Sequence, residues 1–322
     1  MNNQDNASRL ATFADAVPLS QSHSPARKNL LIGAITNYVW NDVAPFFNSY
    51  VQAGFENCDF VMFTRDMSGK TIDRIRSCGV MVFPIPESLR KSSIINCRWK
   101  IYSDYLNSSK GKYDLVFTAD VRDLIFQQDV FKFLDNSNDF LGVAIDDETL
   151  TEARNRAWLV NAYGQELYET IKDERIICVG TVWGTPDKFT EFSEIMWEKL
   201  SSEWSLSRKA IEQAVGNFII YHDGMFADVL RPSSNQDGPV MTLALTDIQD
   251  IHTDINGRVL NGRGEIAAVV HQYDRKLPLV KAAISKYGAG MSSLSKLIQT
   301  HPRSIFWNIL RFSWTIVNRM LQ

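Results

Sequence analysis

Cysteine is scarce in this chain, and its four copies are not closely spaced. They are Cys58, Cys78, Cys97 and Cys178 among 322 residues, and no two form a Cys-x-x-Cys pair. Structural zinc sites need such closely spaced thiols. The sequence therefore argues against a structural zinc site, and we expect reduced, mostly buried thiols in a cytoplasmic protein.

An excess of charge of either sign is also lacking. The chain has 34 basic and 37 acidic residues, a formal net charge of −3. Because no broad positive field is available to attract a polyanion, nucleic-acid binding is not expected. A hydrophobic content of 45% and a charged content of 22% are ordinary for a folded globular protein.

The first 28 residues lack the continuous apolar stretch of a signal peptide. They are rich in Asn, Gln, Ser and Ala instead. We therefore expect residues 1–28 to be a flexible, polar segment ahead of the folded domain.

Glycine-rich phosphate-binding loops are absent from the first 145 residues. Neither Gly-x-Gly-x-x-Gly nor a complete P-loop, Gly-x-x-x-x-Gly-Lys-Ser/Thr, occurs there between a predicted strand and a predicted helix. A dinucleotide-binding domain and a P-loop are therefore not supported. Phosphate groups would have to be met by a divalent cation and by cationic side chains.

Buried strands and helices alternate along the first half of the chain. Apolar runs predict strands at residues 30–35, 59–64, 80–84, 113–118 and 140–145. Helical patterns lie between them, at residues 43–53, 71–78 and 94–106, with a short helix near 130–134. This rhythm is typical of an α/β fold with a mostly parallel sheet flanked by crossover helices.

Two acidic residues follow one of these strands directly. The sequence Asp120-Val121-Arg122-Asp123 comes after the apolar run at residues 113–118. Ligands of α/β sheets bind outside the carboxyl ends of the strands, and carboxylates there are suitable ligands for a hard cation. A simple turn followed by a helix cap is the alternative interpretation.

The segment Thr-Ala-Asp-Val-Arg-Asp-Leu-Ile-Phe-Gln at residues 118–127 resembles the Asp-X-Asp region of metal-dependent nucleotide-sugar glycosyltransferases with the GT-A fold. Three later segments resemble the same family in the same order. Residues 178–185 are similar to its small-residue turn on the acceptor side, and residues 212–217 to its Asp-Gln-x-x-x-Asn helix start, with Glu212 in place of Asp. Residues 269–278 are similar to the strand-His segment of glycogenin-like and galactosyltransferase-like members. The spacing Asp-X-Arg-Asp departs from Asp-X-Asp and leaves open which Asp contacts the metal.

The resemblance implies transfer of a sugar from a nucleotide-sugar donor, a UDP-hexose such as UDP-galactose, to a saccharide acceptor. It implies Mn²⁺ or Mg²⁺ bound by Asp120, Asp123 and His271. The implied donor-binding residues are Thr36, Asn37, Tyr38, Arg98, Arg122, Arg275 and Lys276. The implied sugar-side residues are the catalytic candidates Asp147 and Glu212 and the substrate-binding candidates Gly180, Trp183 and Gln213.

Several of these residues have a structural alternative. His271 ends an apolar run, where a hydrogen-bonded core histidine is common. Gly180 suits an ordinary turn, and Glu212 suits an exposed helix position. Arg98 and Arg122 suit solvated charges.

The last residues form a separate amphipathic pattern. Residues 304–322 have apolar side chains at helical spacing, with Trp and Arg interposed, which predicts a helix lying on a membrane surface. Docking on its own domain or on a second subunit is the alternative. Membrane contact would imply a lipid-linked glycan acceptor in cell-surface polysaccharide synthesis, as in lipopolysaccharide O-antigen or capsule, at the inner face of the cytoplasmic membrane.

We therefore expect a GT-A domain over residues 29–285 and a C-terminal helical segment over residues 286–322. A sugar nucleotidyltransferase would share the sheet and the metal, but it would carry a glycine-rich signature loop near the first strand, and residues 33–42 have none. A non-catalytic, membrane-associated protein with the same fold is the second alternative.

Overall fold

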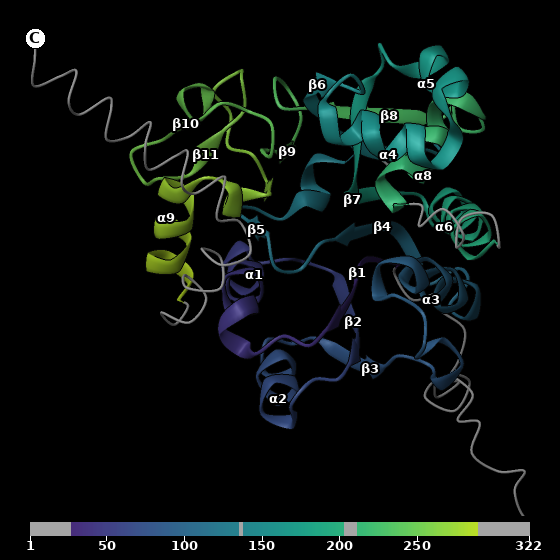
Figure 1. Cartoon of the computed structure of the whole chain (residues 1–322). Coiled ribbons are helices and arrows are strands. Elements are labelled where there is room, and N and C mark those ends of the chain that lie inside the picture. The colour runs from purple at the N-terminus through teal and green to yellow at the C-terminus, as the bar shows by residue number, and fades with distance from the viewer. Residues whose placement is uncertain (1–26, 135–137, 203–210, 289–322) are drawn as a thin grey trace, which may run out of the picture.

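A central β-sheet organises the chain (Figure 1). The computed structural model describes residues 27–134, 138–202 and 211–288. Seven strands in these ranges form one sheet in the order β3-β2-β1-β4-β7-β6-β8. Their bounds are β1 Lys28–Thr36, β2 Cys58–Arg65, β3 Met81–Pro84, β4 Tyr113–Ala119, β6 Leu141–Thr149, β7 Arg175–Gly184 and β8 Leu230–Ser234.

The predicted α/β fold with a mostly parallel sheet is confirmed. The pairs β1/β2, β2/β3, β1/β4 and β6/β8 are parallel, whereas β7 runs antiparallel to both β4 and β6. The sheet is therefore mixed because of one inserted strand. The order of the first strands reverses at β1, which lies between β2 and β4.

Helices cover both faces of this sheet (Figure 1). The helices are α1 Trp40–Ala53, α2 Gly69–Ser77, α3 Ile94–Ser108, α4 Ala153–Tyr163, α5 Gln165–Ile171, α6 Pro186–Ser201, α8 Glu212–Asn217 and α9 Leu277–Tyr287. On one face α1 and α2 bury Phe46, Phe47 and Ile75. On the other face α3 and α6 bury Trp99 and Phe192. Burial of two apolar layers against one sheet is what stabilises such a domain.

A second, small sheet lies beside the carboxyl end of β4. It consists of β5 Leu124–Phe126, β12 Val269–His271 and β9 Val240–Thr242, with β12 in the middle. Near it β10 His252–Thr253 and β11 Val259–Leu260 form a short hairpin. Because β5 begins only five residues after β4 ends, this sheet brings residues near position 270 to the loop that follows β4.

Gln127, the last residue of the Leu-Ile-Phe-Gln sequence, connects the small sheet to the hairpin of β10 and β11. Its side-chain amide donates to the carbonyls of Val259 and Ala267 at 3.0 and 2.8 Å, and its oxygen accepts from the Val259 amide at 2.8 Å. A half-buried polar side chain that satisfies backbone groups in this way stabilises the local structure. This part of the motif therefore has a structural role.

Three local predictions differ from the structure. The turn expected at residues 178–185 is instead most of strand β7, because its small and β-branched residues suit a central strand. The strand expected at residues 140–145 continues to Thr149, so the acidic residues that follow are part of β6. The short helix near residue 130 is a 3₁₀ turn, Val130–Phe133.

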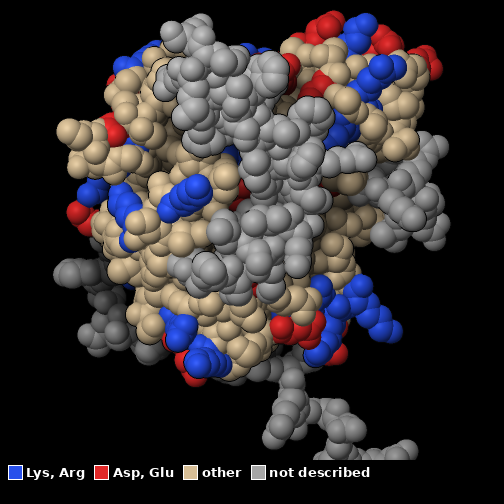
Figure 2. All heavy atoms as spheres, turned by 60° about the vertical axis from the view of Figure 1, so that its left-hand side comes forward, with Lys and Arg blue, Asp and Glu red and all other residues tan. Residues whose placement is uncertain are grey.

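The predictions for the two ends of the chain concern residues that the structure for the most part does not describe. The flexible segment expected at residues 1–28 lies almost wholly outside the described residues, and so does the amphipathic helix expected at residues 304–322. No helix in the described parts of the chain is long and apolar enough to cross a bilayer. On the face shown in Figure 2, basic and acidic side chains are interspersed, in agreement with the balanced composition.

Candidate functional site

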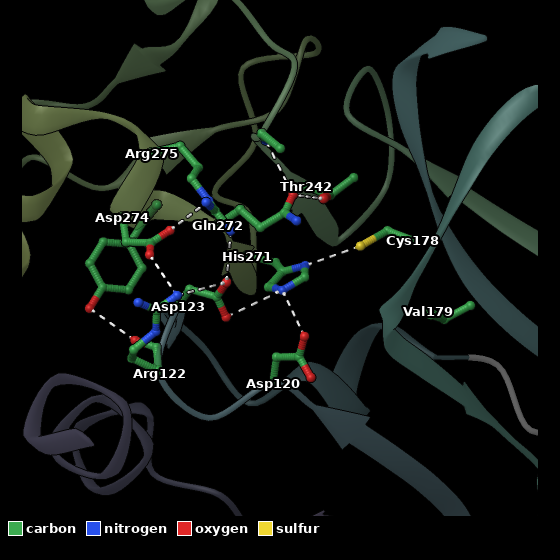
Figure 3. Close-up of polar contacts among 12 residues, drawn as sticks. Asp120, Arg122, Asp123, Cys178, Val179, Thr242, His271, Gln272, Asp274 and Arg275 are labelled. Carbon is green, nitrogen blue, oxygen red and sulfur yellow. Dashed lines mark hydrogen bonds and ion pairs between the residues drawn. The ribbon is translucent and has the colours of Figure 1, made fainter. Parts of the chain in front are cut away.

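Three potential metal ligands meet where the two sheets adjoin (Figure 3). Asp120 and Asp123 lie in the loop between β4 and β5, and His271 is the last residue of β12. In the antiparallel pairing of β12 with β5, His271 lies opposite Leu124, the neighbour of Asp123. One oxygen or nitrogen atom from each of the three side chains lies within 4.8 Å of the others.

The geometry of this cluster directs three atoms toward one point. His271 Nε2 lies 3.5 Å from Asp123 Oδ1 and 3.8 Å from Asp120 Oδ2. Burial opposes protonation of His271, but its contacts with Cys178 and Asp123 raise its pKa well above the ordinary value. Burial also opposes ionisation of Asp123, but His271, Arg122 and Arg275 lower its pKa below the ordinary value.

The cluster is suited to a divalent cation. His271 is 1% exposed, and its Nε2 atom is buried without a hydrogen-bond partner that has proper geometry. A buried polar atom usually has a partner, and a cation would provide one. Two carboxylates and one imidazole fit Mn²⁺ well, whereas Mg²⁺ prefers oxygen ligands alone. Residues Asp120, Asp123 and His271 would hold the ion.

Gly180 of strand β7 makes room for these ligands. The amide of Asp120 donates to the Gly180 carbonyl at 2.9 Å, so the two backbones are adjacent. A Cβ atom on Gly180 would lie 2.5 Å from His271 Cε1 and 2.7 Å from Asp120 Oδ2. A side chain at Gly180 would therefore clash with two members of the cluster.

A buried arginine holds two acidic residues of the site. Arg98 of α3 is 5% exposed, and its guanidinium donates to Asp120 Oδ1 and, at 2.9 Å, to Glu212 Oε1. Trp99 Nε1 donates to the second Glu212 oxygen at 3.1 Å. Burial raises the pKa of Glu212, and Arg98 opposes this shift. Arg98 thus binds one oxygen of Asp120, and the other oxygen faces His271.

Two further arginines, Arg122 and Arg275, lie beside Asp123 (Figure 3). Arg122 Nη2 lies 3.1 Å from Asp274 Oδ2, and Arg275 Nε lies 3.2 Å from Asp274 Oδ1. Each guanidinium is also 3.9 Å from Asp123 Oδ2. Asp274 is 3% exposed, whereas the two arginine side chains are about one quarter exposed, at 26% and 24%. The pair of arginines therefore offers positive charge beside the ligand cluster.

A cleft of about 210 Å³ opens next to the cluster. It is lined by Thr36 at the end of β1 and Tyr38 just beyond it, by the loop of residues 120–123 after β4, and by Arg98 and Glu212. It lies between β1 and β4, where the strand order reverses and where α/β sheets bind ligands. Asn37 has a φ of 59°, a left-handed conformation that Asn tolerates in a turn.

Asp146 is a buried acid near the site and the neighbour of Asp147, the residue chosen from the acidic group 146–148 on sequence alone. Because β6 extends to Thr149, successive side chains alternate between faces: Asp146 is 4% exposed, and Asp147 is exposed. Burial raises the pKa of Asp146 to about 7; the hydrogen bond from the Asp147 amide, His271 and Lys276 oppose this shift, and the charge of Asp147 adds to it. The alternation of a longer strand would have revealed Asp146.

Asp147 belongs to a separate polar group. Its Oδ2 accepts from Thr246 Oγ1 at 2.7 Å and from Asn235 Nδ2 at 2.8 Å, and Arg175 lies 3.5 Å from its Oδ1. Lys276 donates to the carbonyl of Thr246 in the same group. Both candidate residues therefore hold the loop around position 246 in this structure.

Gln213 and Trp183 also make structural contacts. The Gln213 amide donates to the Ile177 carbonyl at 2.6 Å, and its oxygen accepts from the Val179 amide at 3.3 Å. Trp183 is 3% exposed and stacks on Phe117 with a centroid distance of 5.7 Å. This burial makes Trp183 a core residue, contrary to the expected sugar-binding role, because its ring has no open face for a ligand.

The fold and the site together define an α/β protein with a candidate divalent-cation site at the carboxyl edge of a mixed sheet. No protein-family model matches the sequence, and no curated protein matches it. Among solved structures, the chain is similar to the galactosyltransferase LgtC in complex with donor and acceptor sugar analogues, with 15% identity and a TM-score of 0.47. It is also similar to an active-site mutant of LgtC, with 14% identity and a TM-score of 0.49. Each alignment covers 80% of this chain and 95% of the other.

Proposed function

We propose that this chain is a metal-dependent glycosyltransferase of the GT-A type. One observation carries the proposal: four segments that resemble this family in sequence, although up to about 150 residues apart, meet around one point. Asp120 and Asp123 come from the first, Gly180 from the second, Glu212 from the third and His271 from the fourth. Chance resemblance of short motifs does not explain this convergence.

The chemistry of sugar transfer fits the charges of the site. When the bond between the anomeric carbon and the phosphate oxygen breaks, a diphosphate leaves and carries the developing negative charge. A cation held by Asp120, Asp123 and His271 would neutralise part of this charge. Arg122 and Arg275 lie on the same side as Asp123 and would bind the diphosphate oxygens.

The remaining donor contacts follow from the cleft. Thr36, Asn37 and Tyr38 would contact the nucleobase and ribose at the end of β1. Arg98 would act mainly by holding Asp120 in place. Lys276 would act by holding the loop near Thr246.

Carboxylates are proposed on the sugar side. Glu212 lines the cleft, and Arg98 and Trp99 each donate a hydrogen bond to one of its oxygens. It would remain in this position and orient a sugar hydroxyl. Asp147 would contact the acceptor from the group around Thr246, and Gln213 would support Glu212 from the same helix. Asp146 joins these candidates because burial favours its neutral form, which donates a hydrogen bond.

The donor we propose is a UDP-hexose, such as UDP-galactose, with Mn²⁺ favoured over Mg²⁺ by the imidazole ligand. The acceptor we propose is a lipid-linked glycan in surface polysaccharide synthesis, used at the inner face of the cytoplasmic membrane. The amphipathic pattern of residues 304–322 supports this acceptor.

The experiment is product analysis with several UDP-hexoses, Mn²⁺ and saccharide acceptors. A glycosyltransferase releases UDP, whereas a sugar nucleotidyltransferase consumes or releases pyrophosphate. Asp123→Asn is expected to lower the rate at least about 100-fold, because the cation contributes several kcal/mol to stabilising the leaving group. Asp104→Asn is the matched control, since Asp104 is 47% exposed on α3, where it pairs with Lys100. UDP release that is unchanged in Asp123→Asn would refute the proposal.

A further inference from the structure

The two ring nitrogens of His271 face different groups (Figure 3). Nε2 faces Asp123 and Asp120, as described above. Nδ1 lies 3.4 Å from Cys178 Sγ on the other side of the ring. Since His271 is 1% exposed and Cys178 is 5% exposed, solvent has little access to this contact.

Binding of a cation at Nε2 fixes the position of the remaining ring proton. The cation needs the Nε2 lone pair, so a neutral imidazole must carry its proton on Nδ1. An N–H group in a buried position without an acceptor destabilises the folded state. Cys178 Sγ is within reach of this N–H and is able to accept from it, although sulfur is a weak acceptor.

An irregularity in strand β7 brings Cys178 to this position. Val182 pairs with Val143 of β6 and Cys178 pairs with Ala144, so residues 179–181 of β7 have no partner in β6. Thr181 still pairs with Ala119 of β4. Bulges of this kind redirect side chains and are frequent beside functional sites.

The same strand segment therefore supplies two features of the site. Cys178 and Gly180 are two residues apart, and both adjoin the His271 ring: the first provides a sulfur for Nδ1, and the second leaves space at Cε1. Val179 between them packs in the core on the other face of the sheet. The His271 ring thus faces Cys178 at Nδ1 and Gly180 at Cε1.

A thiol differs from the usual partner of a metal-bound histidine. A carboxylate in that position would add a negative charge to a region where Asp120 and Asp123 already provide two. A thiol orients the ring and adds no formal charge. The choice of Cys178 therefore keeps His271 oriented at a low cost in buried charge.

We propose that Cys178 is a positioning residue of the cation site: its sulfur accepts the Nδ1–H of His271, selects that tautomer, and so directs the Nε2 lone pair toward the cation. The inference rests on the proposed function, because it requires that the cluster binds a divalent cation. Cys178 itself contacts neither the cation nor the substrate.

The test is the affinity of the full-length protein for Mn²⁺, measured by electron paramagnetic resonance of the free ion. Cys178→Ala and Cys178→Val both remove the acceptor, and the second keeps the volume filled. Each is expected to weaken Mn²⁺ binding about 10- to 100-fold, the usual effect of losing such a partner. Cys178→Ser keeps an acceptor and is expected to bind close to the wild type. Cys58→Ala removes a thiol at the start of β2 and serves as the control.

A second measurement separates orientation from packing. In ¹⁵N spectra of the protein with one equivalent of Zn²⁺, a diamagnetic ion that accepts imidazole ligands, His271 is expected to be wholly in the Nε2-coordinated, Nδ1-protonated form in the wild type and in Cys178→Ser, and only partly in that form in Cys178→Val. Wild-type Mn²⁺ affinity in both Cys178→Ala and Cys178→Val would overturn the inference, and so would equal weakening in Cys178→Ser. A wild type that binds no Mn²⁺ would overturn the proposed function, and the inference with it.

Discussion

Gly180→Ala is the substitution whose effect on the site is most directly calculable. The new Cβ would lie 2.5 Å from His271 Cε1 and 2.7 Å from Asp120 Oδ2, whereas ordinary contacts begin at 3.4 Å. One or both ligands must therefore move by about 1 Å, which exceeds the roughly 0.2 Å tolerance of metal–ligand distances. We expect Mn²⁺ affinity to fall at least about 100-fold, which corresponds to about 2.8 kcal/mol.

The same substitution is expected to leave the fold intact at a modest cost. Overpacking of a buried site costs typically about 1–3 kcal/mol, so the protein should unfold cooperatively at a lower denaturant concentration. Gly69→Ala is the matched control, because a Cβ on Gly69 meets no atom within 4 Å. Calorimetric Mn²⁺ titration of both variants provides the comparison. If Gly180→Ala binds Mn²⁺ as tightly as Gly69→Ala does, the cluster described here is not the cation site.

Three further variants test the surroundings of the site. Arg98→Met leaves Glu212 and Asp120 without their shared partner and should lower the free energy of unfolding by about 3–5 kcal/mol in denaturant titration. The double variant with Glu212→Leu should recover part of this stability. Burial raises the pKa of Asp146 to about 7 from 3.8, so between these pH values the folded protein holds a proton that the unfolded chain has lost. The free energy of unfolding should therefore fall as the pH rises through that window, by about 4 kcal/mol in total. Asp146→Asn should remove this pH dependence, and a dependence that persists in the variant would contradict the assignment. Gln127→Ala removes two hydrogen bonds to Val259 of β11 and one to Ala267, and should cost about 1–3 kcal/mol in thermal unfolding, with no change in Mn²⁺ affinity at pH 7.

Local signals in the sequence were sufficient to predict the first half of the fold. Apolar runs and helical spacing gave β1, α1, β2, α2 and β3, since each element is set by its own pattern of buried residues. Strand β7 was predicted as a turn, because glycines and small residues are typical of both a turn and a crowded central strand. Its neighbours in the sheet are β4 and β6, and no local pattern reveals that it pairs with both.

The sequence also predicted the members of the ligand cluster, but not their surroundings. Asp120, Asp123 and His271 were proposed together from the resemblance, and they lie within one cluster. The contact between Cys178 and His271 depends on a three-residue irregularity in β7, and spacing does not encode it. The same holds for Asp274, whose role is visible only when both flanking arginines are in place.

The buried position of Trp183 shows a limit of inference from residue type. Trp183 was proposed to bind substrate because it lies in the segment 178–185 that resembles the acceptor side of the family, but Phe117 stacks on its ring at 5.7 Å. A Cβ on Gly142 would lie only 2.0 Å from the indole nitrogen, so Gly142 gives the ring its space in the core. Packing partners from neighbouring strands decided the role of this residue.

We propose that the cluster binds a divalent cation, which in turn binds a nucleoside diphosphate. Calorimetric titration of UDP with and without Mn²⁺, on the wild type and on His271→Ala, tests it most directly. We expect UDP to bind only when Mn²⁺ is present, and this binding to be lost in His271→Ala. UDP binding of equal strength without Mn²⁺, or full Mn²⁺-dependent binding by His271→Ala, would contradict it.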